Sequence, residues 1–158
     1  MRGFIKADIP NTELHIYGEG DFRKELEELA KEYSSVKYMG IAPNNVIVEN
    51  ELKATLLVNP RPTDADYTKY SFPSKNMEYM ASGTPILTTR LPGMPKDYYD
   101  YIYTIDGNSK EDITAALQKV LANSQAELLC MGKKAKAFVL ENKNNVAQSA
   151  RILALLED

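Results

Sequence analysis

Ser74, Lys75 and Glu78 are three residues whose types and spacing could do chemistry together. They lie in the stretch SFPSKNMEYMASGTP, where a helix is predicted to begin at Ser74 and to end before Gly83. The first amides of a helix suit a phosphate, to which Ser74 would add a hydroxyl and Lys75 a full charge. Positions i and i+4 share a helix face, so Glu78 would stand beside Ser74. Its carboxylate could accept hydrogen bonds from ribose hydroxyls, and the pattern therefore favours a nucleotide diphosphate ligand.

The same three residues also have a purely structural interpretation. Ser74 would then be a helix cap, Lys75 a solvated side chain and Glu78 a surface residue. The pattern Ser-Lys-x-x-Glu is short, so its spacing alone leaves both interpretations open.

Strands and helices are predicted to alternate along the whole chain. Apolar alternation and continuous apolar runs predict strands at 13–17, 36–39, 54–58, 85–89 and 101–105. Helical spacing predicts helices at 22–33, 46–52, 74–82, 109–122, 124–140 and 143–156, with Asp21 as the N-cap of the first. This alternation is typical of an α/β fold with a doubly wound parallel sheet. Ligands of such folds bind beyond the carboxyl ends of the strands, where the loop 59–75 is placed.

Composition bounds the class of protein. The 158 residues predict one domain, and a net charge of −3 argues against a nucleic-acid partner. No apolar run is long enough for a transmembrane segment. The single cysteine, Cys130, and the single histidine, His15, disfavour a disulfide or a metal cluster, so no metal site is predicted. Low cysteine content favours a reducing, cytoplasmic location.

Several stretches resemble retaining glycosyltransferases of family 4, which have the two-domain GT-B fold. FPSKNMEYMASGTPIL is similar to the family's signature region, and ATLLVNP to the strand that enters it. LHIYGEGDFRKELEELA resembles the family's strand–GxG–helix, and VKYMG the strand that follows. The similarity covers residues 13–122. It implies a Rossmann-like C-terminal domain that binds a nucleotide sugar, particularly of enzymes that build bacterial surface polysaccharides.

The resemblance implies roles for individual residues. The second of the family's two glutamates falls on Glu78, which would bind the ribose, and Lys75 would stabilise the leaving diphosphate. The first glutamate, which contacts the donor sugar, falls on Tyr70; Asp64, Asp66 or Thr68 could replace it. Donor-binding roles are implied for Phe72, Pro73, Ser74 and Asn76 at the diphosphate and sugar, and for Gly40, Ile41 and Asn44 at the base. Arg61 is a loop cation within possible reach of phosphate.

The expectation for the chain as a whole follows from this resemblance. Residues 1–158 would be one nucleotide-sugar-binding domain that lacks the N-terminal acceptor domain and the first βα unit. The complete enzyme would be a hexosyltransferase-type enzyme using a UDP- or GDP-linked sugar without a cofactor. It would be cytoplasmic or peripheral at the inner face of the membrane, and the isolated chain would be inactive. The alternative is a non-catalytic, flavodoxin-like binding domain, which the loss of the first glutamate favours.

Overall fold

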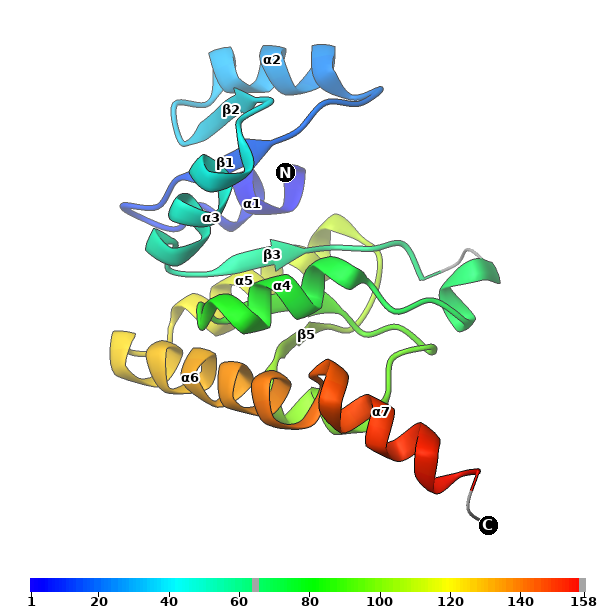
Figure 1. The fold of residues 1–158 in the computed structure, drawn as a ribbon. Helices are drawn as coiled ribbons and strands as arrows, with labels where there is room; N and C mark the ends of the chain where they lie inside the picture. Colours follow the sequence, from blue (N-terminus) through cyan, green and yellow to red (C-terminus); the bar gives the residue numbers. More distant parts are fainter. Residues whose placement is uncertain (64–65, 157–158) are drawn as a thin grey trace.

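The computed structural model describes residues 1–63 and 66–156, in which helices and strands alternate as predicted (Figure 1). The strands are β1 (Leu14–Tyr17), β2 (Val36–Gly40), β3 (Leu57–Asn59), β4 (Ile86–Thr89) and β5 (Tyr103–Ile105). The helices are α1 (Arg2–Ala7), α2 (Arg23–Glu32), α3 (Asn44–Lys53), α4 (Ser74–Ser82), α5 (Lys110–Leu121), α6 (Gln125–Asn142) and α7 (Asn145–Ala154). Two short 3-10 helices, η1 (Asp66–Lys69) and η2 (Lys96–Tyr101), precede α4 and β5. The predicted α/β class is confirmed.

The strands form two hydrogen-bonded groups, and every pairing is parallel. β1 pairs with β2, and β4 lies between β3 and β5. Within the described residues no strand pairs with both β1 and β3, so the sheet is divided at this point (Figure 1). The apolar run at 54–58 predicted a strand buried on both sides, but β3 begins only at Leu57 and Val58 is half-buried. β3 pairs with β4 along one edge only, so its other edge is less covered than that of a central strand.

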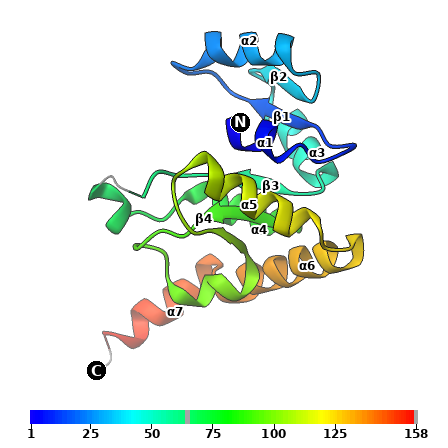
Figure 2. The ribbon, with the colours of Figure 1, turned by 180° about the vertical axis from the view of Figure 1, so that it is seen from behind.

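Helices cover both faces of the β3–β4–β5 group. Ile86 of β4 belongs to one apolar core, with Met80 of α4 and Phe138 of α6. Its neighbour Leu87 belongs to the other, with Leu117 of α5. Consecutive side chains of a strand point to opposite faces, so β4 is the layer that separates the two cores. Figures 1 and 2 show α4 on one side of this layer and α5 on the other.

Aromatic residues of η2 complete the core beneath α6. Tyr98 is buried and meets the ring of Phe138 edge-on, at 5.2 Å between centroids. The ring of Tyr101 stacks on the ring of Phe138, at 4.2 Å between centroids. Tyr98 and Tyr101 therefore pack with Phe138 in the apolar core.

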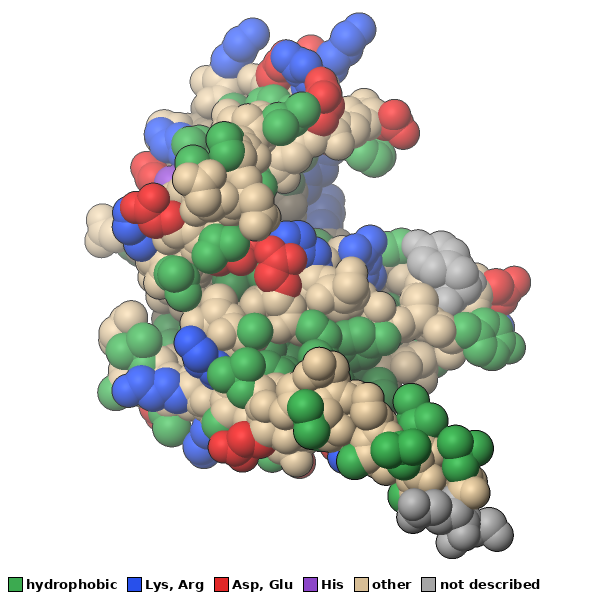
Figure 3. Space-filling model, in the orientation of Figure 1, with side chains coloured by type: hydrophobic (Ala, Val, Ile, Leu, Met, Phe, Trp, Pro, Cys, Tyr) green, Lys and Arg blue, Asp and Glu red, His purple; other side chains and the backbone are tan. Residues whose placement is uncertain are grey.

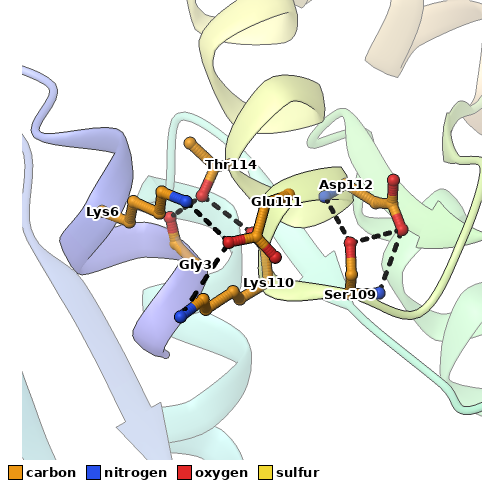
Figure 4. A network of polar contacts seen from close by, with 7 residues as sticks. All are labelled: Gly3, Lys6, Ser109, Lys110, Glu111, Asp112 and Thr114. Carbon is orange, nitrogen blue, oxygen red and sulfur yellow. Dashed lines mark hydrogen bonds and ion pairs between the residues drawn. The ribbon is translucent and has the colours of Figure 1, made fainter.

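Helix α1 was not predicted, because residues 1–12 have little helical periodicity. Contacts with α5 hold it instead (Figure 4). The hydroxyl of Thr114 donates to the carbonyl of Gly3 at 2.9 Å, and the Lys6 ammonium lies 2.6 Å from the Glu111 carboxylate. Phe4 of α1 is buried in the core below. Six residues cannot form a stable helix alone, so this element depends on tertiary packing.

The start of α2 differs from the prediction. Phe22, not Asp21, is the N-cap, and no side chain caps this helix. Phe22 is exposed, although its spacing placed it on the apolar face. Arg23 lies between Glu19 and Glu27, at 2.8 Å from each carboxylate, so surface ion pairs support this first turn. The prediction of an Asp21 cap was wrong.

Helix α7 projects from the body of the protein with its apolar side chains uncovered (Figure 3). No residue of α7 is buried, and Val146, Leu153 and Leu156 are all more than half exposed. The apolar face expected for 143–156 is therefore present and has no partner among the described residues. Within those residues, no helix is long and apolar enough to cross a membrane.

Helix α6 approaches the end of α4 most closely at a glycine. Gly83 ends α4 as the predicted left-handed C-cap, with φ at 86°. A Cβ at Gly132 of α6 would overlap the Gly83 carbonyl oxygen. Because backbone cannot move aside as a flexible side chain can, only glycine fits here.

Gly132→Ala should therefore push α6 away from α4. We expect the free energy of unfolding to fall by about 1–3 kcal/mol, the usual effect of overpacking. Urea denaturation followed by circular dichroism measures it. Gly20→Ala is the matched control, because a Cβ there meets nothing within 4 Å. Equal stability of the two variants would show that α6 can shift without cost.

Candidate functional site

A hollow of about 200 Å³ lies in front of α4, beyond the carboxyl ends of the strands. It is lined by Arg61, Thr68, Ser71, Phe72, Pro73, Ser74 and Leu91. The structure thus brings four of the predicted site residues together, namely Arg61, Phe72, Pro73 and Ser74. Their common wall is the loop that leads from β3 into α4.

A buried polar network fixes the start of α4 beneath this hollow. The Asn76 side chain accepts a hydrogen bond from the Asn59 amide at 2.7 Å and donates to the Thr88 hydroxyl at 3.3 Å. Thr88 in turn donates to the Asn59 carbonyl at 3.0 Å. These bonds join α4 to the ends of β3 and β4. They satisfy polar groups that would be costly to bury unpaired.

Asn76, which was predicted to bind the donor, is buried in this structure. Its side chain has 0% exposure, and its backbone amide donates to the Pro73 carbonyl at 2.9 Å. Neither group faces the hollow. In this structure Asn76 supports the site from below and does not line it.

The first turn of α4 presents its polar groups to the hollow. Pro73 is the N-cap, and no side chain caps the helix, so the Ser74 hydroxyl is not used for capping. Ser74 is exposed at the first helical position. The first amides of an α-helix have no partner inside the helix and carry partial positive charge. This arrangement suits an anion at the mouth of the hollow.

Lys75 and Glu78 interact directly, and a third residue joins them. The Lys75 ammonium lies 2.7 Å from the Glu78 carboxylate. It also lies 3.7 Å from a carboxylate oxygen of Glu51, a buried residue of α3. One cation is therefore shared by two carboxylates. The sequence predicted Lys75 and Glu78 at this turn but gave no sign of Glu51.

The surroundings shift the ionisation of this group of residues. Burial, and next the charge of Glu78, raise the pKa of Glu51, although Lys75 opposes them. Partial burial acts to lower the pKa of Lys75, but the hydrogen bond and charges of the two glutamates outweigh it and raise that pKa. Lys75 therefore remains a cation, and ionisation of the Glu51 carboxyl is disfavoured.

Arg61 lies between the first hollow and a second. The second has about 330 Å³ and is lined by Pro60, Arg61, Pro62, Thr89, Gly107, Asn108 and Ile113. The Arg61 amide donates to the Thr89 hydroxyl at 2.8 Å, which holds this loop on the end of β4. Asn108 accepts from the Thr63 amide at 3.0 Å. The sequence analysis did not predict Asn108 as a site residue. Its position just after the last strand could have indicated it, because ligands bind beyond the carboxyl ends of the strands.

The other predicted residues, Lys75 and Glu78 included, are not part of the lining of either hollow. Gly40, Ile41 and Asn44 form the turn from β2 into α3, with Gly40 in a left-handed conformation at φ 65°. Ile41 is exposed. This turn lies at the same carboxyl edge of the sheet as α4, and α3 packs against α4. A ligand would have to extend along α3 to reach it.

The residues considered for sugar recognition differ in their position relative to the first hollow. Tyr70, where the sequence resemblance placed the first glutamate, is 89% exposed and does not line the hollow. Thr68 is buried and lines it, with its hydroxyl donating to the Thr63 carbonyl at 3.3 Å. Asp66 pairs with Lys69 at 2.9 Å. Asp64 lies outside the described residues, so Thr68 is the candidate that the hollow includes.

Three further side chains, those of Arg90, His15 and Cys130, lie outside the lining of both hollows. Arg90 is held by Asp106 at 2.6 Å and by the ring of Tyr99, so it is already neutralised. His15 pairs with Glu13 on the surface, and Cys130 is a free, exposed thiol. In the described part of the chain, no group of three His, Cys, Asp or Glu residues could hold a metal ion.

The sequence of the chain was compared with those of known protein families and proteins. The profile described as "Glycosyl transferases group 1" matches residues 3–123, more than half of the chain. A protein of Bacillus subtilis (strain 168), "Putative teichuronic acid biosynthesis glycosyltransferase TuaH", is 36% identical over 62 residues. That match covers 39% of this chain and 16% of the relative. The matched region includes β1 to β5 and the first turn of α4, and the chain belongs to the group 1 glycosyl transferases.

Proposed function

We propose that this chain binds a nucleotide diphosphate sugar at the start of α4 and serves the transfer of its glycosyl group to an acceptor. One observation carries the proposal. The first hollow is lined by Arg61 and by Pro73 and Ser74 at the start of α4. Lys75 and Glu78 follow in the same helix, beyond this lining, and are paired at 2.7 Å. Cationic groups for phosphates and a carboxylate for hydroxyls thus lie one helical turn apart.

The diphosphate would lie against the amides of the first turn, between Arg61 and Lys75. Charge develops on this leaving group as the glycosyl bond breaks, and fixed donors stabilise it most when they are already in place. The buried network below α4 keeps the helix amides in position. Arg61, Ser74 and Lys75 would supply the charge and hydrogen bonds, with retention of configuration as in family 4.

The ribose would lie farther along the helix, where Glu78 can accept its hydroxyls. Glu78 is bonded to Lys75 in the structure. Ligand binding must therefore break the contact between Lys75 and Glu78. Lys75 would then contact the phosphates, and Glu78 would contact the ribose. A base of UDP or GDP would follow along α3 toward Gly40, Ile41 and Asn44.

The biological role rests on the relative. The curated match spans 16% of a protein named for teichuronic acid biosynthesis. We extend this to synthesis of a bacterial surface polysaccharide by a hexosyltransferase-type enzyme. The acceptor site would lie in an N-terminal domain of the complete protein, which would work in the cytoplasm or at the inner face of the membrane.

A second candidate is a flavodoxin-like binding domain without catalytic function. Tyr70 favours it, because a glutamate that contacts the donor sugar in family 4 is replaced by an exposed aromatic residue. The two candidates differ in their ligands, and a binding experiment separates them.

Titration with sugar nucleotides tests the proposed function. We expect UDP-glucose or GDP-mannose to bind, ADP-glucose to bind less, and the bound ligand to perturb amides of 72–75 in NMR spectra. The hollow is open and the Lys75–Glu78 pair must separate, so millimolar ligand is appropriate. Glucose alone serves as the control. No shift with any of the three sugar nucleotides would favour the non-catalytic domain.

Glu78→Ala should weaken binding of the nucleoside part. Hydrogen bonds to a charged group contribute about 1.5–3 kcal/mol, so affinity should fall about tenfold to a hundredfold. Calorimetry with uridine or guanosine and the corresponding diphosphate measures the loss. Glu141→Ala, on the exposed surface of α6, is the matched control. If Glu78→Ala binds like wild type and only melts earlier, the carboxylate has a structural role.

Lys75→Ala should act on the opposite end of the same ligand. We expect weaker binding of the nucleoside diphosphate and unchanged binding of the nucleoside, because only the phosphates meet the ammonium. The difference should shrink as salt rises, since Lys75 is partly exposed and its charge is screened. Lys133→Ala, another exposed lysine, is the control. Equal losses for nucleoside and diphosphate would contradict this assignment.

A further inference from the structure

Glu51 is the one charged residue among the buried side chains of the described chain. It lies near the end of α3, and its side chain is 8% exposed. Its backbone is held as well, because the Thr84 hydroxyl donates to the Glu51 carbonyl at 2.7 Å. Thr84 directly follows Gly83, the C-cap of α4. The backbone at Glu51 is therefore tied to the end of α4, and its side chain is buried.

The charges around Glu51 do not balance. Lys75 lies 3.7 Å from Glu51 and 2.7 Å from Glu78, so one ammonium serves two carboxylates. The charged groups that act on Glu51 are these two, both from α4. Tyr79 of α4 is a third titratable group nearby: burial raises the pKa of its phenol, Lys75 lowers it, and the charge of Glu51 raises it. Glu78 is 40% exposed and solvated, whereas Glu51 is not. If one of the two carboxyls takes a proton, burial selects Glu51.

Ligand binding changes this balance in one direction. When Lys75 turns to a diphosphate, Glu51 loses its partner and two new negative charges approach. A buried carboxylate without a counterion is costly, and such a group takes up a proton instead. The buried position of Glu51 favours this response over an unpaired charge.

We propose that Glu51 is a further residue of the donor site, whose carboxyl takes up a proton from solvent when Lys75 turns to the diphosphate. The inference rests on the proposed function, since it requires a diphosphate ligand at α4. Protonated Glu51 releases Lys75 from its second carboxylate and removes a negative charge from behind the phosphates. Glu51 is a positioning residue here, because it acts on the ligand through Lys75.

The sign of the pH dependence follows from linkage. The bound state holds the proton more tightly than the free state, so binding takes up a proton between the two corresponding pKa values. Affinity is highest below the pKa of Glu51 in the free protein and falls as pH rises toward its pKa in the complex. A buried glutamate that only supports helix packing would change the melting temperature without this dependence.

The experiment is calorimetry with UDP-glucose and GDP-mannose from about pH 5 to about pH 8, in two buffers of different ionisation enthalpy. The phosphates of a sugar nucleotide do not titrate in this range, so proton uptake reports on the protein. We expect proton uptake by wild type and an affinity that falls at least about threefold across the range.

Glu51→Gln should bind at the wild-type low-pH affinity throughout and take up no proton, because the amide resembles the protonated carboxyl. Glu49→Gln is the matched control on the exposed face of α3, where Glu49 pairs with Lys53, and should behave like wild type. Unchanged proton uptake in Glu51→Gln overturns the inference while the proposed function stands. Absence of binding by wild type overturns both.

A second measurement needs no variant. The carboxyl carbon of Glu51, followed by NMR in wild type, should titrate at higher pH with saturating sugar nucleotide than without it. An unmoved titration overturns the inference even if Glu51→Gln fails to fold.

Discussion

Asn76 has no exposed surface, yet its side chain is hydrogen-bonded on both sides, to Asn59 and to Thr88. These bonds fix the first turn of α4 on the ends of β3 and β4, and the candidate site depends on that. The helix amides, Ser74 and Lys75 all take their positions from this turn. A buried polar network is stable only when every member has a partner. The site therefore rests on a rigid base, and its mobile parts are the long side chains above it.

Those side chains neutralise one another. Lys75 is shared by Glu78 at 2.7 Å and Glu51 at 3.7 Å, and their burial differs. An exposed ion pair contributes little free energy, so Lys75 and Glu78 can separate at small cost. The buried Glu51 cannot be solvated when the pair opens. Because only one of the two carboxylates is buried, an anion that attracts Lys75 should lead to protonation of Glu51 and leave Glu78 charged.

The two cores on either side of β4 explain how a small domain holds this arrangement. Ile86 and Leu87 anchor opposite layers, and glycine at position 132 lets α6 close onto the end of α4. The β1–β2 pair attaches to one of these layers without hydrogen bonds to β3. At the other end, α7 leaves its apolar side chains uncovered. The hollow in front of α4 belongs to the well-packed part.

The sequence by itself determined most elements of the fold. Periodicity and a glycine cap predicted α4 to the residue, and the order of the motifs indicated a glycosyltransferase, because these signals are local. Tertiary structure alone decided the rest. Helix α1 exists through its contacts with α5, and Asn76 turned out to be buried. Glu51 joined Lys75 from a different helix, 24 positions away in sequence. Burial and charge pairing between distant segments depend on packing, which no local pattern records.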